Sequence, residues 1–385
     1  MIPLVRDTID QKDIIDLISW LTTNPRLTKG EVTIEFEKLW SEYTGVKHSV
    51  YVNSGSSANL AMAYALEVSG KLRNKVVIAP SVSWVTTVAP FIQLGFDVKL
   101  VDSDIDTLGP DIDDLKRLIK QFNPSILIFV HVLGFPSKIK EIKELCEEND
   151  IVLLEDSCES VGSTYDGKRT GSFGLMSSFS LYFGHHLSTI EGGMICTDDD
   201  EIYNVLKSIR AHGWDRDLDE PYKSILRLDN NVGDFKDLYT FYYPGFNLRS
   251  TDLQAYIGLL QMKKIDDVVN IRHRNYELYH NNIKNDYWKI NPTPNSWVSS
   301  FAYPIITPKI KELINSLKNN RIETRPLICG SIAKQPFWVN RYGDTYNQPM
   351  AQKVDDYGLY LPNNHQLTEK EILFVCDVVN GVTST

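Results

Sequence analysis

Short apolar runs alternate with segments of helical periodicity between about residues 48 and 210. Buried strands are predicted for the runs HSVYV, KVVIA, FDVKLVD, SILIFV and IVLLED, and for the later runs SSFSLYF and GGMICTD. Helices are predicted between them by ANLAMAYALEV, DIDDLKRLIKQF and KIKEIKELCEE, and after them by EIYNVLKSIRAHG. Strands that alternate with helices of this length predict a mostly parallel sheet with helices on both faces.

The pattern changes after about residue 215. Residues 215–245 are polar and aromatic with little periodicity, which predicts a long loop with a functional role. Helical periodicity resumes over residues 250–283, and short strands then alternate with helices to the end of the sequence. We therefore predict an α/β fold with a large domain over residues 1–245, including N-terminal helices. A smaller C-terminal α+β domain is predicted over residues 246–385.

Composition and net charge argue against some classes of function. The 385 residues are 42% hydrophobic and 23% charged, as in ordinary globular proteins. A net charge of −10 argues against a general nucleic-acid binder, which needs a basic surface. It leaves room for a local basic pocket that holds a phosphorylated small molecule. The sequence has no apolar signal core and no run of membrane-spanning length, so we expect a cytoplasmic location.

The five cysteines are expected to be free thiols. None lies in a CxxC pair, and the histidines add no zinc-ligand spacing. We therefore predict no metal centre. The cysteines are Cys146, Cys158, Cys196, Cys329 and Cys376.

The stretch NSGSSANLAM, residues 53–62, follows a predicted strand and opens a helix. Gly55 allows a tight turn, and Ser56 and the first amides of the helix can donate hydrogen bonds to an anion. Free N–H groups and the helix dipole together favour a phosphate at this position. A serine-capped helix without any ligand explains the same residues, so the motif alone leaves both interpretations open.

Two further candidates follow predicted strands. Asp156 and Glu159 stand in LLEDSCES, at the carboxyl end of an apolar strand, where ligands bind in open α/β sheets. A carboxylate there can coordinate a metal, orient a histidine or pair with a protonated ring nitrogen. Trp84, in PSVSWVTTV, can stack on a flat cofactor, although an isolated aromatic residue more often belongs to the core.

Together these pieces indicate a pyridoxal phosphate site, which normally also contains a lysine. No lysine lies between Lys168 and Lys207. The segment YFGHHLSTIEGG instead places His185 and His186 in this interval.

The chain resembles, essentially from end to end, the sugar aminotransferase (DegT/DnrJ/EryC1/StrS) family of pyridoxal phosphate enzymes. The resemblance is carried by GEVTIEFEKLW, YVNSGSSANL, LLEDSCESVGSTYDGK, the TIEGGM turn, PGFNLRSTDLQAYIGLLQM and IETRP. It implies the type-I, aspartate aminotransferase-like fold. In that family the cofactor-binding lysine lies six residues before the glutamate of the EGG turn, which is the position of His185. The interval between Asp156 and His185 also fits the family.

Replacement of this lysine by histidine marks the dehydratase branch of the family. The resemblance implies pyridoxal 5′-phosphate and pyridoxamine 5′-phosphate as the cofactor forms and L-glutamate as amino donor. It also implies removal of the C3 hydroxyl from a nucleotide-linked 4-keto-6-deoxy sugar. The similarity of GHHLSTIEGGM and IRAHGWDRDL to this branch implies GDP-4-keto-6-deoxy-D-mannose as the substrate. The product would be a 4-keto-3,6-dideoxy sugar of colitose-type deoxysugar biosynthesis, as used in lipopolysaccharide O-antigen.

His185 is the predicted catalytic residue. An imidazole cannot form the covalent link that a lysine makes, yet it is a good general base or acid near neutral pH. The cofactor would then be held non-covalently. His186 is expected to be a packing or polar neighbour.

The resemblance assigns roles to other residues. Asp156 would pair with the pyridine nitrogen, and Trp84 would stack on the ring. The implied cofactor-binding residues are Gly55, Ser56, Trp84, Asp156, Glu159, Ser180 and Asn247. The implied substrate-binding residues are His212, Arg216, Arg249 and Arg325.

A homodimer with composite active sites is also implied. Asn247, in PGFNLR, resembles the residue that reaches the phosphate of a neighbouring subunit. Arg249 would meet the glutamate carboxylate, because a guanidinium matches it in a bidentate manner. No nucleic acid or membrane partner is expected.

Three alternatives remain open at this stage. One is an aminotransferase that tolerates His185, and another is the same dehydratase chemistry on a different 4-keto nucleotide sugar. The third is a non-enzymatic sensor on the same fold. A related dehydratase branch with an iron–sulfur cluster is disfavoured, because the cysteines are not clustered.

The missing lysine generates a first prediction. The purified protein should lose its cofactor on denaturation or dialysis, and borohydride should not attach pyridoxal to residue 185. Peptide mass spectrometry after borohydride treatment measures this. A borohydride-stable adduct on any lysine of the chain would contradict the assignment.

Overall fold

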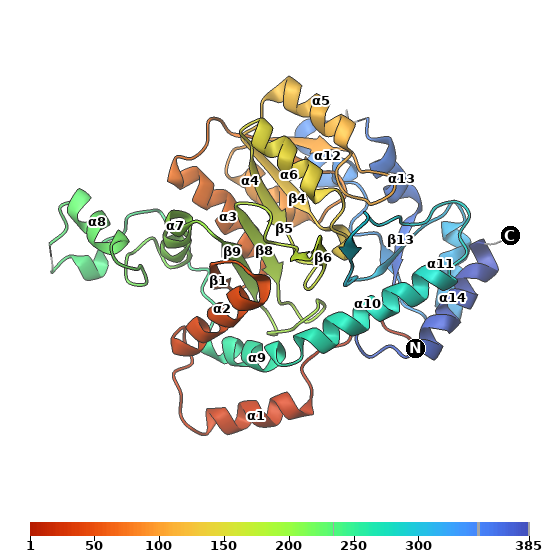
Figure 1. Ribbon diagram of the computed structural model, residues 1–385, viewed down its shortest axis with the longest axis horizontal. Coiled ribbons are helices and arrows are strands. Elements are labelled where there is room, and N and C mark those ends of the chain that lie inside the picture. Colours follow the sequence, from red (N-terminus) through yellow and green to blue (C-terminus); the bar gives the residue numbers. More distant parts are fainter. Residues whose placement is uncertain (234, 345–346, 384–385) are drawn as a thin grey trace.

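A seven-stranded sheet forms the centre of the larger part of the molecule (Figure 1). The computed structural model describes residues 1–233, 235–344 and 347–383. The strand order is β1-β9-β8-β5-β4-β2-β3, and β9 is antiparallel to both of its neighbours while the other pairings are parallel. The predicted mostly parallel sheet is therefore confirmed. Its strands are β1 (His48–Val52), β2 (Val76–Pro80), β3 (Asp97–Val101), β4 (Ile126–Val130), β5 (Val152–Asp156), β8 (Met176–Ser180) and β9 (Gly193–Thr197).

Helices cover both faces of this sheet, because alternate strand residues point to opposite sides. One face packs on α3, α4 and α7, and the opposite face packs on α5 and α6 and, further along, on α2, α9 and α10. The bounds are α2 (Glu31–Thr44), α3 (Gly55–Ser69), α4 (Val85–Gln93), α5 (Ile112–Phe122), α6 (Ile139–Glu148), α7 (Asp200–Arg210), α9 (Asp252–Met262) and α10 (Ile265–Asn282).

The C-terminal part builds a second core around a three-stranded antiparallel sheet in the order β11-β13-β12. Helices α10, α11 and α14 pack together beside it. The bounds are β11 (Tyr303–Ile306), α11 (Ile310–Asn319), β12 (Arg325–Pro326), α12 (Pro336–Tyr342), α13 (Pro349–Tyr357), β13 (Gly358–Leu361) and α14 (Glu369–Thr383). A small sheet of β10 (Ser296–Trp297), β6 (Thr164–Tyr165) and β7 (Lys168–Arg169) joins segments from both halves of the chain.

The N-terminal residues pack into the C-terminal core. Ile2 bridges Ile322, and the Leu4 N–H donates to the Glu323 carboxylate at 2.9 Å. Helix α1 (Gln11–Leu21) then returns to pack against α9. The domain division between residues 245 and 246 stays a prediction.

Residues 215–245 contain helical structure that the sequence did not lead us to expect. Helix α8 (Tyr222–Asp229) and a 3₁₀ turn at Asp237–Tyr239 lie in an arm that extends from the body of the molecule (Figure 1). Eight residues are too few for a clear helical period, which explains the omission. The side chains of Leu228 and Phe235 are 77% and 95% exposed. Within the described residues, no helix is long and apolar enough to cross a membrane.

Candidate active site

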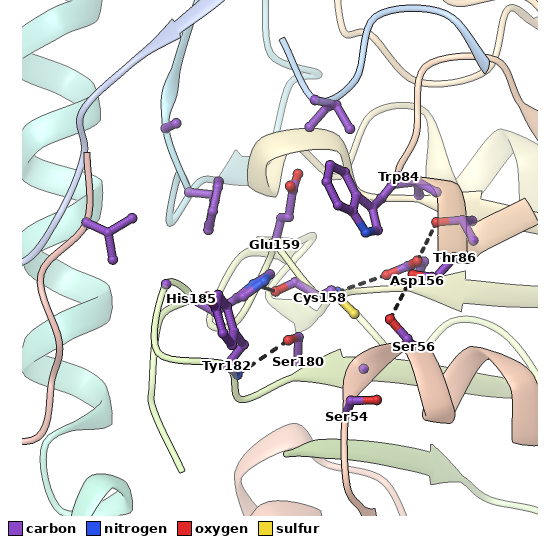
Figure 2. Close-up of a pocket in the computed structure, with 18 of the residues that line it drawn as sticks. Ser54, Ser56, Trp84, Thr86, Asp156, Cys158, Glu159, Ser180, Tyr182 and His185 are labelled. Atoms are coloured by element: carbon purple, nitrogen blue, oxygen red, sulfur yellow. Dashed lines mark hydrogen bonds between the residues drawn. The ribbon is translucent and has the colours of Figure 1, made fainter. Parts of the chain in front are cut away.

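A cavity of about 360 Å³ lies at the carboxyl ends of β5 and β8, between the large sheet and the C-terminal part (Figure 2). Ligands in open α/β sheets bind at this edge, and helix α3 opens beside it. The sheet side of the cavity is mainly polar, whereas the opposite side is mainly apolar. The polar lining residues of the sheet side are Ser54, Ser56, Asn59, Thr86, Thr87, Asp156 and Ser180.

The start of α3 forms a cup for an anion. Ser54 caps the helix through its hydroxyl, which accepts the Ser57 N–H at 3.0 Å, and no acidic residue stands in the first turn. The Ser56 hydroxyl donates to the Thr86 hydroxyl at 3.0 Å. A Cβ atom added at Gly55 would lie 2.8 Å from Cβ of Ser180, so only glycine allows this close approach of backbone and strand end. Free N–H groups and the helix dipole suit a phosphate here.

The Asp156 carboxylate, at the end of β5, is 5% exposed. Its Oδ2 atom accepts hydrogen bonds from the Asn59 amide at 2.8 Å and from the Thr87 hydroxyl at 2.7 Å. The Cys158 N–H donates to its Oδ1 atom at 3.2 Å. Three donors fix the orientation of this carboxylate, which lines the cavity and can pair with a cationic ring nitrogen.

Trp84 precedes α4 and lines the cavity. Its side chain is 55% exposed, so it does not belong to the core, and Figure 2 shows its indole opposite Cys158 and His185. An exposed indole beside a polar cup provides a flat surface on which an aromatic ligand can stack.

His185 projects into the cavity from the turn after β8 (Figure 2). Its Nδ1 atom lies 2.7 Å from the Cys158 carbonyl oxygen. A carbonyl only accepts, so Nδ1 carries the proton and Nε2 keeps its lone pair in the neutral ring. Nε2 is therefore the atom that can take a proton from a ligand.

The surroundings keep this imidazole neutral. Burial, assisted by the positive charge of Arg272, lowers the pKa of His185 to about 4, although the Cys158 carbonyl and the Asp156 charge act in the opposite direction. The ring is thus a free base throughout the neutral range. A base that is unprotonated at working pH can accept a proton without first losing one.

His186 points away from the cavity. It is fully buried, and its Nε2 atom lies 3.0 Å from the Ser299 carbonyl oxygen, which accepts the Nε2 proton. It is absent from the lining residues. The chain turns and bends here rather than running extended, and it directs the His185 ring to the cavity and the His186 ring to the interior.

Glu159 lines the cavity near His185 (Figure 2). Burial, with a contribution from the Asp156 charge, raises the pKa of its carboxyl to about 8, although the Leu133 N–H donates to Oε2 at 2.9 Å and opposes this shift. The carboxyl is consequently protonated at neutral pH. It can donate a hydrogen bond into the cavity.

The opposite side of the cavity is an apolar wall, which comprises Leu4, Val5, Val130, Phe301, Ala302 and Ile328. These residues come from the N-terminal segment, the end of β4 and the C-terminal part, and they pack into one core cluster. Arg325, one of the predicted substrate-binding residues, and Tyr360 add polar atoms beside this wall.

Four predicted site residues lie outside the cavity of their own chain. His212, Arg216, Asn247 and Arg249 gather instead around Trp214. The Arg249 guanidinium donates to Asn247 Oδ1 at 3.0 Å and lies 3.2 Å from Nε2 of His212. We call these four residues and Trp214 the second cluster.

Sequence reasoning missed several lining residues. Asn59 and Thr87 are polar positions on otherwise apolar, buried helices, and that exception in the pattern could have revealed them. Leu4 and Phe301 carried no such signal, because only the packing of distant segments brings them to the cavity.

The residues present fit pyridoxal phosphate. The start of α3, which Gly55 allows to approach the end of β8 closely, suits the phosphate. The triply held Asp156 suits the ring nitrogen, and Trp84 suits the ring face. No lysine stands among the described residues that line the cavity, whereas His185 does line it. The site can therefore bind this cofactor without a covalent bond.

The profile of the DegT/DnrJ/EryC1/StrS aminotransferase family matches residues 8–380. A GDP-4-keto-6-deoxy-D-mannose 3-dehydratase of Escherichia coli O55:H7 is 36% identical over 375 residues, which is 95% of each protein. A protein of the same name from Yersinia pseudotuberculosis is 35% identical over 379 residues, 96% of this chain and 95% of that protein. The resemblance inferred from motifs is confirmed.

Solved structures agree. The E. coli GDP-4-keto-6-deoxy-D-mannose-3-dehydratase with bound hydrated PLP has a TM-score of 0.90 and 34% identity, and the match covers 98% of this chain and 99% of that chain. A structure of the dehydratase with a trapped PLP–glutamate geminal diamine has a TM-score of 0.89 at 34% identity, covering 98% of this chain and 100% of that chain. The predicted aspartate aminotransferase-like fold is confirmed.

The two histidines generate the next prediction. His185→Asn should retain the cofactor but lose about 10²–10⁴-fold in kcat, because the lone pair at Nε2 is gone. His186→Asn should be much milder, since that ring does not line the cavity and its hydrogen bonds go to Ser299. Steady-state kinetics on both variants measure the difference. If His186→Asn is inactive while His185→Asn turns over normally, the assignment is wrong.

Proposed function

Because the chain belongs to the DegT/DnrJ/EryC1/StrS aminotransferase family, we propose that it is a pyridoxamine phosphate-dependent nucleotide-sugar 3-dehydratase. It removes the C3 hydroxyl of GDP-4-keto-6-deoxy-D-mannose, with L-glutamate as amino donor. The observation that carries this proposal is His185, which stands as a neutral base where aminotransferases of this family have lysine.

The cofactor, when bound, supplies the amino group and a ring that stores an electron pair. Asp156, held by Asn59 and Thr87, would keep the ring nitrogen protonated, and Trp84 would hold the ring plane. Nε2 of His185 would remove a proton from carbon and return it to the departing C3 hydroxyl. A histidine that has just gained a proton is a suitable acid for that second transfer.

The reaction balances without an additional reductant. Glutamate becomes 2-oxoglutarate, its nitrogen leaves as ammonia, and the sugar loses one oxygen atom. The sugar loses one oxygen atom and the carbon skeleton of glutamate gains one, so the overall reaction is balanced in oxygen. A lysine enzyme would instead leave the nitrogen on the sugar.

The apolar wall supports a 6-deoxy sugar as substrate. A C6 methyl group placed against Leu4, Val5 or Phe301 would bury apolar surface, whereas a C6 hydroxyl would lose its hydrogen bonds to water. Glu159 and Arg325 provide polar contacts for oxygen atoms on the same side.

The second cluster supports a homodimer with composite sites. Arg249 and Arg216 lie over Trp214 at 5.8 and 4.0 Å from its ring centroid, and neither lines the cavity of its own chain. Arg216 is exposed, and Arg249 and Trp214 are half-buried. Cationic and aromatic side chains in this arrangement suit a phosphate-rich ligand in the cavity of a neighbouring subunit. Exposed Phe235 and Leu228 of the arm are available to a partner. We also propose that the protein is cytoplasmic.

Product analysis tests the function. The protein, loaded with pyridoxal phosphate, should convert GDP-4-keto-6-deoxy-D-mannose and glutamate to a GDP-sugar with one oxygen atom fewer, together with 2-oxoglutarate and ammonia. Mass spectrometry separates this product from an amino sugar that keeps its C3 hydroxyl. The amino sugar would identify an aminotransferase, and turnover of only another 4-keto nucleotide sugar would correct the substrate.

Hybrid dimers test the composite site. Asp156→Asn and Asn247→Ala should each be inactive, because one damages the cavity and the other the contribution of the partner subunit. Mixed and reassociated, they should regain about a quarter of the native activity, since half of the dimers then carry one intact site. Each variant alone, taken through the same steps, is the control. A fully active monomer in light scattering would refute the dimer.

A further inference from the structure

Arg272 is a buried guanidinium beside the turn that carries both histidines. It lies on α10 and is 2% exposed. Its Nη1 atom donates to the carbonyl oxygens of Phe301 at 2.9 Å and Asn363 at 2.5 Å, and Nη2 donates to the carbonyl oxygen of His185 at 3.2 Å. Arg272 thus connects the C-terminal part to the main chain of the catalytic histidine.

This cation has no anionic partner in the described part of the chain. Its hydrogen bonds reach only main-chain carbonyls, and its Nε atom is buried without an acceptor. Burial lowers the pKa of Arg272 to about 9, so the group stays charged at neutral pH. A buried unpaired charge costs free energy, and a neutral amide could bond to carbonyls at lower cost. The cost of burying this charge therefore indicates that the charge itself has a function.

The groups that face His185 define that function. From the end of β5, the Asp156 carboxylate and the Cys158 carbonyl favour the protonated ring. From α10, the Arg272 charge opposes protonation of both His185 and His186. Without this cation, burial alone would have to keep the ring neutral against a carboxylate and a carbonyl.

We propose that Arg272 is a positioning residue of the dehydratase site, whose guanidinium holds the His185 main chain and whose charge assists burial in keeping Nε2 of His185 free to accept a proton. The inference rests on the proposed function. Arg272 contacts neither the cavity nor its ligands, because it is absent from the lining residues. It acts through His185.

The test measures the titration of His185 directly. In protein labelled with ¹³C at histidine Cε1, the His185 signal is assigned by its loss in His185→Asn. Arg272→Met, which is apolar and similar in length, should move the His185 midpoint up by about one pH unit or more. The acid limb of kcat/KM should move equally, giving about tenfold lower kcat/KM below the midpoint.

Two further variants complete the experiment. Arg272→Lys keeps a cation but carries its donors on one nitrogen instead of a planar fork, so it cannot reproduce the geometry of the three bonds made by Nη1 and Nη2. It should therefore keep the midpoint of the His185 titration and lower kcat. It also supplies the measurement if Arg272→Met does not fold. Arg274→Met is the matched control, because Arg274 lies on the same helix but is exposed and bonds to Asn275 and Leu367. Arg274→Met should change neither the midpoint of the His185 titration nor the acid limb of kcat/KM.

Two results would overturn the proposal. One is an unchanged His185 midpoint in folded Arg272→Met, and the other is a shift in Arg272→Lys as large as in Arg272→Met. Both can occur while the wild-type protein still deoxygenates the sugar, in which case only this inference fails. A shifted His185 midpoint in a protein that lacks the dehydratase activity would instead support the effect of Arg272 on His185 and reject the proposed function.

Discussion

The chemistry of this site depends on one hydrogen bond, from Nδ1 of His185 to the Cys158 carbonyl. It fixes the tautomer, aims Nε2 at the cavity, and joins the turn after β8 to the segment that follows β5. Asp156, the last residue of β5, stands two residues before Cys158, so the proposed base and the proposed partner of the ring nitrogen share one anchor. A displacement of the Cys158 main chain would therefore disturb both groups together.

The strands and the helices that alternate with them could be predicted from the sequence, because buried strands and amphipathic helices have different periods. The short helix in the arm could not, since eight residues give too little periodicity. Within the site, Asp156, Glu159 and His185 were found because each stands close to a strand end in a recognisable motif. The apolar wall could not be found this way, because Leu4 and Phe301 meet only through tertiary packing.

The two sides of the cavity differ in the kind of contact they offer a ligand. The sheet side, with Gly55, Asp156 and Ser180, is held by backbone and by buried hydrogen bonds, which suits a cofactor that must stay fixed. The opposite side consists of apolar contacts from the N-terminal segment, the end of β4 and the C-terminal part. In the proposed function, replacement of a lysine by His185 changes the base and leaves the rest of the cavity unchanged, so a family of amine-transferring enzymes can include one that removes oxygen.

The position of the N-terminal segment has a consequence for folding. Ile2 pairs with Ile322, and the Pro3 carbonyl accepts a hydrogen bond from the Asn364 amide 361 positions away in the sequence. Contacts of such sequence separation close a long loop and carry its entropy cost, whereas neighbouring parallel strands of the central sheet are joined by single helical crossovers. Leu4 and Val5 can take their places at the cavity only when these distant segments have met, so we expect the apolar wall to close later in folding than the central sheet.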